Sequence, residues 1–475
     1  MKAAVAVATL VLVLTAAPAA VAADDVPSPP SPTEPCDSIS PIAIPCIVLG
    51  KAFDALSHEC RRIGLPDALC VLPLAHKVTK AARDAYQSSW VHQVAKFQRE
   101  LGDPLPLRDA QWLGTHNSFN SLTQGLTLSH LDSNQQLSLT HQLDIDVRSI
   151  ELDLHYIPRL ELLLKKEVTV CHGQGNIGCT TEPTFKKVLP EIAKWVNTPA
   201  NSDEIVMLYL EDGLGGNAQA YASTVATITD VLRRPDGSSL VYQPNPADKA
   251  ANGCVPLPTG ISRDDIRASG ARVLIVGSCA PGWSSVVFDW SPAHVESGST
   301  ARYQAPPACD ATYGADVYAN QIVRYFEDST LVSALLDPFR APADPNRLTP
   351  QKVKWMTDCG VNLFGFDQLL PEDGRIQASL WSWAPDEPRA GAGDCTLQRG
   401  ADGRWVAADC AETHPAACAS GDSWTLTAPV TFAAAPAACA SLGATFGLPR
   451  AGDQNARLHA VAAPAGGAWV SYSLG

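Results

Sequence analysis

The chain has 475 residues, of which 46% are hydrophobic and 18% are charged, and its formal net charge is -14 at pH 7. This composition is typical of a folded globular protein, and the length allows more than one domain. The charge argues against a nucleic-acid partner, because binding to phosphate requires a basic face. An anionic membrane would repel the chain on average, so any work on lipids needs a local site or a metal.

The first 22 residues have the pattern of a secretory signal peptide. Lys2 supplies a positive start, an apolar run follows from 3 to 17, and Ala20-Val21-Ala22 matches an A-x-A cleavage signal. We therefore expect residues 1–22 to be removed and the mature protein to be secreted, with a retained anchor as the alternative. The 14 cysteines are consistent with an oxidising compartment.

Residues 23–105 divide into a linker and a helical segment. The linker, DDVPSPPSPTEP, is rich in proline and serine, which favours an extended, mobile chain. Further along, a helix is expected because these apolar residues lie near one helix face: Ala85, Trp90, Val94 and Phe97. Four cysteines of this region are expected to form two local disulfides, with all three pairings open: Cys36, Cys46, Cys60 and Cys70.

From about residue 108 to 370, short apolar runs alternate with helix-like segments. Strands are expected at RSIELDL (148–154), VTVC (168–171), EIVMLYLE (204–211), ARVLIVG (271–277) and VNLFGFD (361–367). Helices are expected at 183–197 and 219–234. Strands that alternate with helices favour a parallel α/β sheet, either open or closed into a barrel.

The strand at 148–154 carries two carboxylates on one face. Glu151 and Asp153 alternate with apolar residues, and residues two apart in a strand point the same way. Two like charges this close repel unless something neutralises them. A bound calcium or magnesium ion would do so, because both ions prefer carboxylate oxygens. The alternative is an exposed strand edge with two hydrated acids.

Other polar residues stand at or just after the ends of predicted strands. His116 lies in QWLGTHNSFNS, His172 follows VTVC, and Glu211 and Asp212 end EIVMLYLED. Parallel α/β proteins place their active sites at the carboxyl ends of strands. Each histidine alone is more often structural, but the shared placement of two histidines and several acids favours one common site.

Four short stretches, THNSF, RSIELDL, CHG and LYLED, occur in an order and at a spacing that resemble the catalytic barrel of the phosphatidylinositol-specific phospholipases C. The resemblance covers roughly residues 108–370 and implies a TIM-like (β/α) barrel, which we assign to residues 106–378. The complete acidic set resembles the calcium-dependent branch of these enzymes. The metal-independent bacterial branch has an arginine where the calcium sits.

The resemblance implies a role for each matching residue. His116 corresponds to the general base that takes the proton of the inositol 2-hydroxyl, and His172 to the general acid for the departing alkoxide. The implied cofactor is Ca²⁺, and the residues that match its ligands are Asn117, Glu151, Asp153 and Glu211.

Two further features bear on the histidines. Asp367 ends a late strand, where it either orients His116 or serves as a structural acid or helix cap. Cys171 and Cys179 flank the loop after His172. A disulfide between them would rigidify this loop, and pairing elsewhere is the alternative.

The implied activity is cleavage of phosphatidylinositol-type lipids at a membrane surface, giving diacylglycerol and cyclic inositol phosphate. Related lipases that bind phosphates on the inositol ring use lysines on a later strand. The strand compared here, ARVLIVG, has Arg272 as its only basic residue. The expected substrate is therefore plain phosphatidylinositol or another lipid with an inositol-type or glycerol-type head group. Two alternatives stay open. One is a glycerophosphodiester or sphingolipid phosphodiesterase on the same barrel. The other is a non-catalytic surface-binding protein that keeps the barrel and uses the lectin-like C-terminal region described next.

Residues 379–475 are rich in Trp, Cys, Gly and Ala, which indicates a small disulfide-stapled domain. WSWAPDEP…GRWVAADC…AAC resembles the closing half of a C-type-lectin-like domain, and FAAAPAACASLGATFGLPR resembles its opening half, in exchanged order. That resemblance implies the disulfides Cys395–Cys410 and Cys418–Cys439. Trp405-Val406-Ala407 stands where such lectins bind calcium through Trp-Asn-Asp, so carbohydrate binding is not expected.

Overall fold

The computed structural model describes residues 80–121, 133–159, 165–172, 179, 182–310, 312–330, 333, 344–371 and 373–474. The predicted signal peptide at 1–22, the linker and the four cysteines Cys36, Cys46, Cys60 and Cys70 lie outside the described residues.

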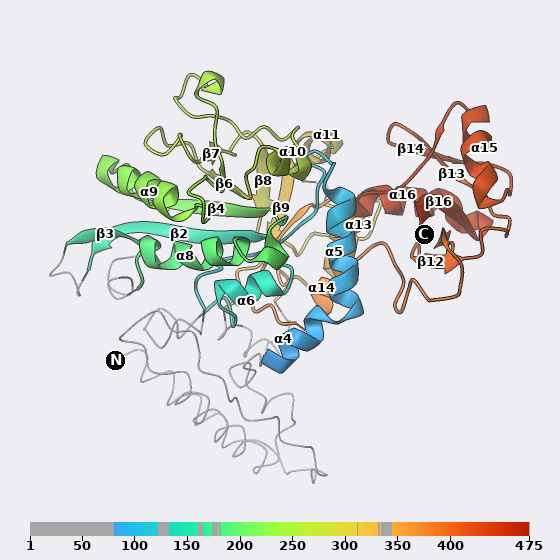
Figure 1. The fold of residues 1–475 in the computed structure, drawn as a ribbon, viewed down its shortest axis with the longest axis horizontal. Coiled ribbons are helices and arrows are strands. Elements are labelled where there is room, and N and C mark those ends of the chain that lie inside the picture. The colour runs from blue at the N-terminus through green and yellow to red at the C-terminus, as the bar shows by residue number, and fades with distance from the viewer. Residues whose placement is uncertain are drawn as a thin grey trace, which may run out of the picture.

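The largest sheet is built almost entirely from parallel strands, as the sequence predicts (Figure 1). Its strands follow the order β5-β6-β4-β2-β1-β10-β9-β8, with β7 parallel to β6 and β3 antiparallel to β2. The bounds are β1 Trp112–Thr115, β2 Ser149–Pro158, β3 Lys166–Val170, β4 Val206–Gly213, β5 Val241–Tyr242, β6 Val273–Gly277, β7 Phe288–Asp289, β8 His294–Ser297, β9 Ile322–Phe326 and β10 Leu363–Phe366.

The sheet curves around a buried interior. Phe288 of β7 and Ile322 of β9 belong to one core cluster, although their strands stand near opposite ends of the strand order. Trp112 of β1 and Met207 of β4 complete this cluster from the middle of the sheet. Within the described residues no backbone pairing joins β8 to β5 or β7, so the barrel is incomplete. The predicted α/β fold is therefore confirmed, with the parallel strands forming an open half-barrel.

Helices cover the outer face of the sheet, and α8 and α9 lie along β2 and β4 (Figure 1). Ile150, Leu152 and Leu154 of β2 are fully buried against this layer, each worth roughly 1.5–3 kcal/mol of burial. The helices before the C-terminal region are α4 Lys80–Gln87, α5 Trp90–Gly102, α6 Leu139–Asp144, α8 Phe185–Val196, α9 Ala218–Val231, α10 Arg263–Ala268, α11 Ala315–Asn320, α13 Pro350–Cys359 and α14 Gly374–Ser379.

Helix α5 stands between the barrel and the C-terminal region (Figure 1). On the C-terminal side, the ring of Phe97 packs against Trp383, Trp405 and Tyr472. The side-chain oxygen of Gln98 accepts hydrogen bonds from the backbone of Trp381 at 2.6 Å and of Ser382 at 2.9 Å. The helix predicted before residue 105 thus joins two parts of the molecule.

The C-terminal region holds two three-stranded antiparallel sheets, in the orders β12-β11-β16 and β14-β13-β15. Its elements are β11 Cys395–Arg399, β12 Trp405–Ala408, β13 Ala417–Ser420, β14 Ser423–Leu426, α15 Ala435–Ser441, β15 Thr445–Phe446, α16 Gly452–Ala462 and β16 Gly467–Ser473. No helix in the described part of the chain is both long enough and apolar enough to cross a membrane.

Disulfides cross-link the barrel and the C-terminal region, each within itself. The implied pairs Cys395–Cys410 and Cys418–Cys439 are both present, and so is the Cys171–Cys179 pair beside His172. Two further pairs, Cys254–Cys279 and Cys309–Cys359, staple loops of the barrel. Every cysteine in the described ranges is paired.

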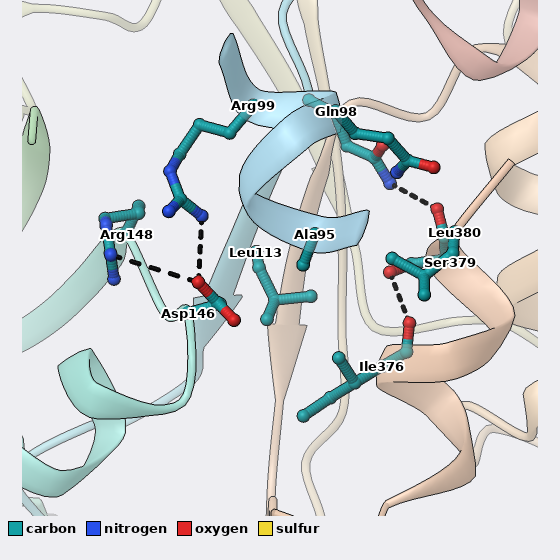
Figure 2. A pocket seen from close by; sticks show the side chains of 10 residues that line it. Ala95, Gln98, Arg99, Leu113, Asp146, Arg148, Ile376, Ser379 and Leu380 are labelled. Atoms are coloured by element: carbon teal, nitrogen blue, oxygen red, sulfur yellow. Dashed lines mark hydrogen bonds and ion pairs between the residues drawn. The ribbon is translucent and has the colours of Figure 1, made fainter. Parts of the chain in front are cut away.

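A network of charged residues anchors α5 at the amino end of the barrel (Figure 2). Asp146, which is 2% exposed, accepts from Tyr86 Oη at 2.8 Å and from Arg99 Nη1 at 3.0 Å. His92 Nδ1 also lies 2.8 Å from Asp146. A shallow pocket beside this network is lined by Arg99, Arg148 and residues of α14. Its charged groups are already paired with each other, which favours a structural role for this end.

Replacing Asp146 tests whether this network stabilises the fold. Burial alone would raise the pKa of Asp146, but the hydrogen bond from His92 and the charge of Arg99 lower it to about 2. Because the folded pKa is depressed, the stabilisation is present above the unfolded pKa of about 3.9 and is lost as pH falls toward 2. Asp146→Asn should lower the free energy of unfolding by about 3 kcal/mol at neutral pH.

The measurement is urea unfolding of the wild type and Asp146→Asn between neutral pH and the lowest pH at which the protein stays folded. The difference between the two should shrink as the pH falls below about 4. Asp230→Asn, on the exposed side of α9, is the matched control and should leave stability unchanged. A difference that stays constant with pH would contradict the charge-based account.

Candidate active site

His116 follows β1 at the carboxyl end of the sheet. Its backbone N–H donates to the Phe366 carbonyl at 3.1 Å, which continues the pairing of β1 with β10. The residue is 8% exposed. Its Nδ1 lies 3.4 Å from Asp367 Oδ2, and its ring centroid lies 4.9 Å from that of Phe326. The structure therefore brings His116 and Asp367 together from adjacent parallel strands.

Asp367 is held by several hydrogen-bond donors. Its Oδ2 accepts from the Ser329 backbone at 2.7 Å and from Asn134 Nδ2 at 3.2 Å, and its Oδ1 accepts from Gln135 Nε2 at 3.2 Å. Burial raises the pKa of Asp367, and the adjacent His116 works against that rise. Burial alone would lower the pKa of His116, but the charges of Asp367 and Glu151 raise it above its usual value. With Asp367 ionised, the 3.4 Å contact is satisfied when His116 Nδ1–H donates to the carboxylate.

Three carboxylates share a small volume next to this pair. Glu151 and Asp153 lie on β2, and the register of the parallel strands places Glu211 of β4 directly beside Asp153. One oxygen from each of the three lies within 4.8 Å of the others. Asp153 Oδ1 is buried and has no hydrogen-bond partner among the described residues. Burial, followed by the charges of Glu151 and Glu211, raises the pKa of Asp153 well above its usual value.

Such a group is chemically suited to a divalent cation. Hard cations prefer several carboxylate oxygens, and a cation offsets the mutual repulsion of the three acids. The unpartnered oxygen of Asp153 is the strongest indication, because a buried polar atom without a partner is costly. The candidate site residues therefore fit a metal such as the one the sequence predicts.

Arg324 on β9 contacts this acidic group from across the barrel. Its Nη2 lies 2.5 Å from Glu151 Oε2, and its Nη1 pairs with Glu296 of β8. The guanidinium carbon lies 5.2 Å from the ring centroid of Tyr209 and 4.8 Å from that of Phe326. One of the three acids thus already has a cationic partner within the protein.

Asn117 lies beside the acids through its backbone. Its N–H donates to Glu151 Oε2 at 3.3 Å, and its φ of 45° turns the chain sharply after His116. Its side-chain nitrogen donates to Asn134 Oδ1 at 3.3 Å. Asp212, the neighbour of Glu211, accepts from Tyr221 Oη at 2.6 Å and belongs to the packing of α9.

His172 reaches the site by a hairpin. We expected VTVC to be one of the strands of a parallel sheet, but β3 runs antiparallel to β2 and returns toward the site. The backbone N–H of Cys171 donates to the Asp153 carbonyl at 3.1 Å, so His172 follows directly beside β2. His172 Nδ1 lies 3.4 Å from Asn120 Nδ2. The two predicted histidines are therefore linked through the loop that follows β1.

Several residues of the site were missed by the sequence analysis. Ser133, Asn134, Gln135 and Gln136 are consecutive polar residues that are all buried. Glu327, which follows β9, accepts from the Asp367 backbone at 3.2 Å and pairs with Arg375. The signal that could have revealed β9 is the apolar strand IVRYF ending in Glu-Asp, as β4 also does.

Comparisons with known proteins identify the family. A family model described as the Rv2075c PI-PLC-like domain matches residues 71–373. The uncharacterized protein Rv2075c of Mycobacterium tuberculosis is 66% identical over 473 residues, covering 98% of this chain and 97% of the relative. The phosphatidylinositol-specific phospholipase C from Listeria monocytogenes is 15% identical with a TM-score of 0.38, covering 60% of this chain and 97% of that chain.

A second solved structure is a calcium-dependent phosphoinositol-specific phospholipase C from the Gram-negative bacterium Pseudomonas sp, with 13% identity and a TM-score of 0.30. It covers 58% of this chain and 93% of that chain. At these identities no residue role is transferred from either structure. The fold and the family match define a PI-PLC-like α/β barrel protein. The chain belongs to the family of the Rv2075c PI-PLC-like domain.

Replacing Glu327 tests whether its ion pair with Arg375, next to Asp367, stabilises the fold. Glu327 is 1% exposed and also accepts from the Leu348 backbone at 2.9 Å. Glu327→Gln keeps the size of the side chain but removes the charge that pairs with buried Arg375. We expect a loss of about 3 kcal/mol in the free energy of unfolding, measured by chemical denaturation at neutral pH. Glu167→Gln, on the exposed start of β3, is the matched control. Equal stability of both variants would show that the ion pair is unimportant.

Proposed function

We propose that this protein is a secreted, calcium-dependent phosphodiesterase that cleaves phosphatidylinositol-type lipids at a membrane surface. The observation that carries the proposal is one cluster: His116 paired with Asp367, beside three carboxylates that include the unpartnered oxygen of Asp153. An acid–base residue next to a cation-binding group is the arrangement that phosphodiester cleavage by a sugar hydroxyl needs. Family membership supports the same reaction class.

Glu151, Asp153 and Glu211 would hold the cation, with Asn117 at its edge. A bound Ca²⁺ would polarise the inositol hydroxyl and offset the charge that builds on the phosphoryl oxygens. The fit is supported by the chemistry of the donors, which are all oxygen ligands.

His116 supplies the base in this proposal. Because its Nδ1 faces Asp367, Nε2 is the nitrogen available to take the proton of the inositol 2-hydroxyl. The 2-oxygen then forms a bond to phosphorus, and the bond from phosphorus to the diacylglycerol oxygen breaks. His172 gives a proton to that leaving oxygen. The products are diacylglycerol and a cyclic inositol phosphate, and each proton transfer contributes about 10²–10⁴ in rate.

The expected substrate has no additional phosphates on the inositol ring. Arg272, the only basic residue in the strand compared with lysine-bearing lipases, precedes β6 at the amino end of the sheet. Its guanidinium donates to the Ala271 carbonyl at 2.6 Å and to the Arg267 carbonyl at 3.2 Å. Arg272 is therefore engaged by backbone carbonyls, at the end of the sheet opposite to the three acids.

The division into residues 1–22, 23–105, 106–378 and 379–475 is part of the proposal. The paired cysteines support an oxidising, extracellular location. The lectin-like character of residues 379–475 stays a prediction, and the region contains the disulfides that this resemblance implies.

The direct test is cleavage of phosphatidylinositol vesicles by the purified mature protein. We expect cyclic inositol phosphate with calcium and none with a chelator, measured by ³¹P NMR. His116→Ala and His172→Ala should each lower the rate by at least about 10²-fold, because each removes a proton-transfer group. His414→Ala, in the C-terminal region, is the control and should leave the rate unchanged.

The products separate the alternatives. Free glycerol phosphate would favour a glycerophosphodiester substrate, and phosphocholine from sphingomyelin would favour a sphingolipid phosphodiesterase. No cleavage of any phosphodiester by the folded protein, with any divalent cation, would favour a non-catalytic binding protein.

Calcium binding is tested separately by thermal unfolding. A ligand at 100 times its dissociation constant stabilises the folded state by about 2.7 kcal/mol. The midpoint of unfolding should therefore rise with calcium in the wild type and should not rise in Asp153→Asn. Asp212→Asn, whose carboxylate contacts Tyr221 instead, should keep the response. A calcium response that survives in Asp153→Asn would place the ion elsewhere.

A further inference from the structure

Arg324 is a buried cation that stands between two acids at the candidate cation site. It lies on β9 and is 4% exposed. Its Nη2 lies 2.5 Å from Glu151 Oε2, and its Nη1 pairs with Glu296 of β8. A guanidinium does not lose its charge in a protein, so Glu151 faces a permanent positive charge. The acidic group therefore has a cationic partner of its own before any metal binds.

Packing fixes the position of this guanidinium. Its carbon lies 5.2 Å from the ring centroid of Tyr209 and 4.8 Å from that of Phe326, within the range of cation–π contacts. Gly365 of β10 leaves the necessary space, because a Cβ at this position would lie 3.2 Å from Arg324 Nη2 and 2.8 Å from Phe326 Cβ. The barrel interior thus holds Arg324 against the acids, unlike an arginine on the surface.

Glu296 gives Arg324 a second partner outside the candidate cation site. Its side chain is 36% exposed, and it is not one of the three acids whose oxygens lie within 4.8 Å of one another. If Glu151 turned an oxygen toward a metal ion, Arg324 would keep its pair with Glu296. The positive charge would therefore remain beside the site.

A divalent ion held by the three acids would meet this charge at close range. Ca²⁺ lies about 2.3–2.6 Å from each oxygen ligand, and Arg324 Nη2 already lies 2.5 Å from an oxygen of Glu151. An ion bound through Glu151 would thus stand a few ångströms from the guanidinium. Like charges at such a separation repel, and the burial of both residues limits screening by water.

We propose that Arg324 is a built-in competitor of the metal, which holds the acidic group together without an ion and weakens calcium binding. This inference rests on the cation site of the proposed function and not on its substrate. Ligand charge tunes calcium affinity, and extracellular modules bind the ion with dissociation constants of about 10⁻⁴–10⁻³ M. Arg324 places this site in that weak range, so the site fills only where calcium is abundant.

The test is isothermal titration of calcium into the purified full-length mature chain. The wild type should bind with a dissociation constant of about 10⁻⁴–10⁻³ M. Arg324→Met keeps an unbranched side chain but removes the charge, and it should bind calcium at least about 10-fold more tightly. Arg324→Lys keeps the charge and should stay closer to the wild type. Arg457→Met removes an exposed arginine paired with Asp453 and, as the control, should change nothing.

Thermal unfolding of the same variants covers the case in which Arg324→Met is unstable. Without calcium, this variant leaves Glu151 without its partner and should unfold at a lower temperature than the wild type. Calcium should raise its midpoint by more than it raises that of the wild type. A variant that is unfolded in chelator should refold when calcium is added, because the ion then neutralises the acids. Failure to fold at high calcium would overturn the inference.

Equal or weaker calcium binding by a folded Arg324→Met would also contradict the inference, since Arg324 would then be indifferent to the ion or needed for it. A wild type that binds no calcium would refute the calcium dependence of the proposed function. Binding that appears only in Arg324→Met would in that case still support the competitor, and no binding by either protein would refute both.

Discussion

The repulsion among three carboxylates is the constraint on which the rest of the site depends. The parallel register of β2 and β4 sets Glu211 beside Asp153, and Glu151 stands two residues earlier on the same face. Three acids in one partly buried volume require positive charge nearby. Arg324 supplies part of it by contacting Glu151, and Asp153 keeps an oxygen with no partner in the described part of the chain. The barrel therefore holds an acidic group that a cation would complete.

The two ends of the barrel have different roles. At the amino end, the charges of Asp146, Arg99 and Arg148 pair with each other or with Glu204, so they fasten α5 to the sheet. At the carboxyl end, buried Asp367 organises its surroundings through four hydrogen-bond donors, and the acids beside it stay incompletely neutralised. The charged network that holds α5 and the candidate active site thus lie at opposite ends of the same parallel strands, and the carboxyl end is the usual position of active sites in α/β barrels.

The sequence predicted the parts of this structure that depend on local pattern. Alternating apolar residues revealed β2, and strand endings pointed to His116, Glu211 and Asp367. The antiparallel course of β3 was not predicted, because a short apolar strand carries no sign of its direction. Arg324 was missed because an arginine inside a strand indicates exposure, and its burial depends on Glu151, which lies 173 residues away in sequence. Asn134 was missed because its hydrogen-bond partner Asp367 lies 233 residues away in sequence.

The central claim is that the three carboxylates form a cation site next to His116. The most direct measurement is a crystal structure of the protein grown with Mn²⁺ in place of Ca²⁺, in which anomalous scattering locates the ion. The account predicts one strong peak coordinated by Glu151, Asp153 and Glu211. A structure that shows these carboxylates without an ion, while His116 still faces Asp367, would contradict it.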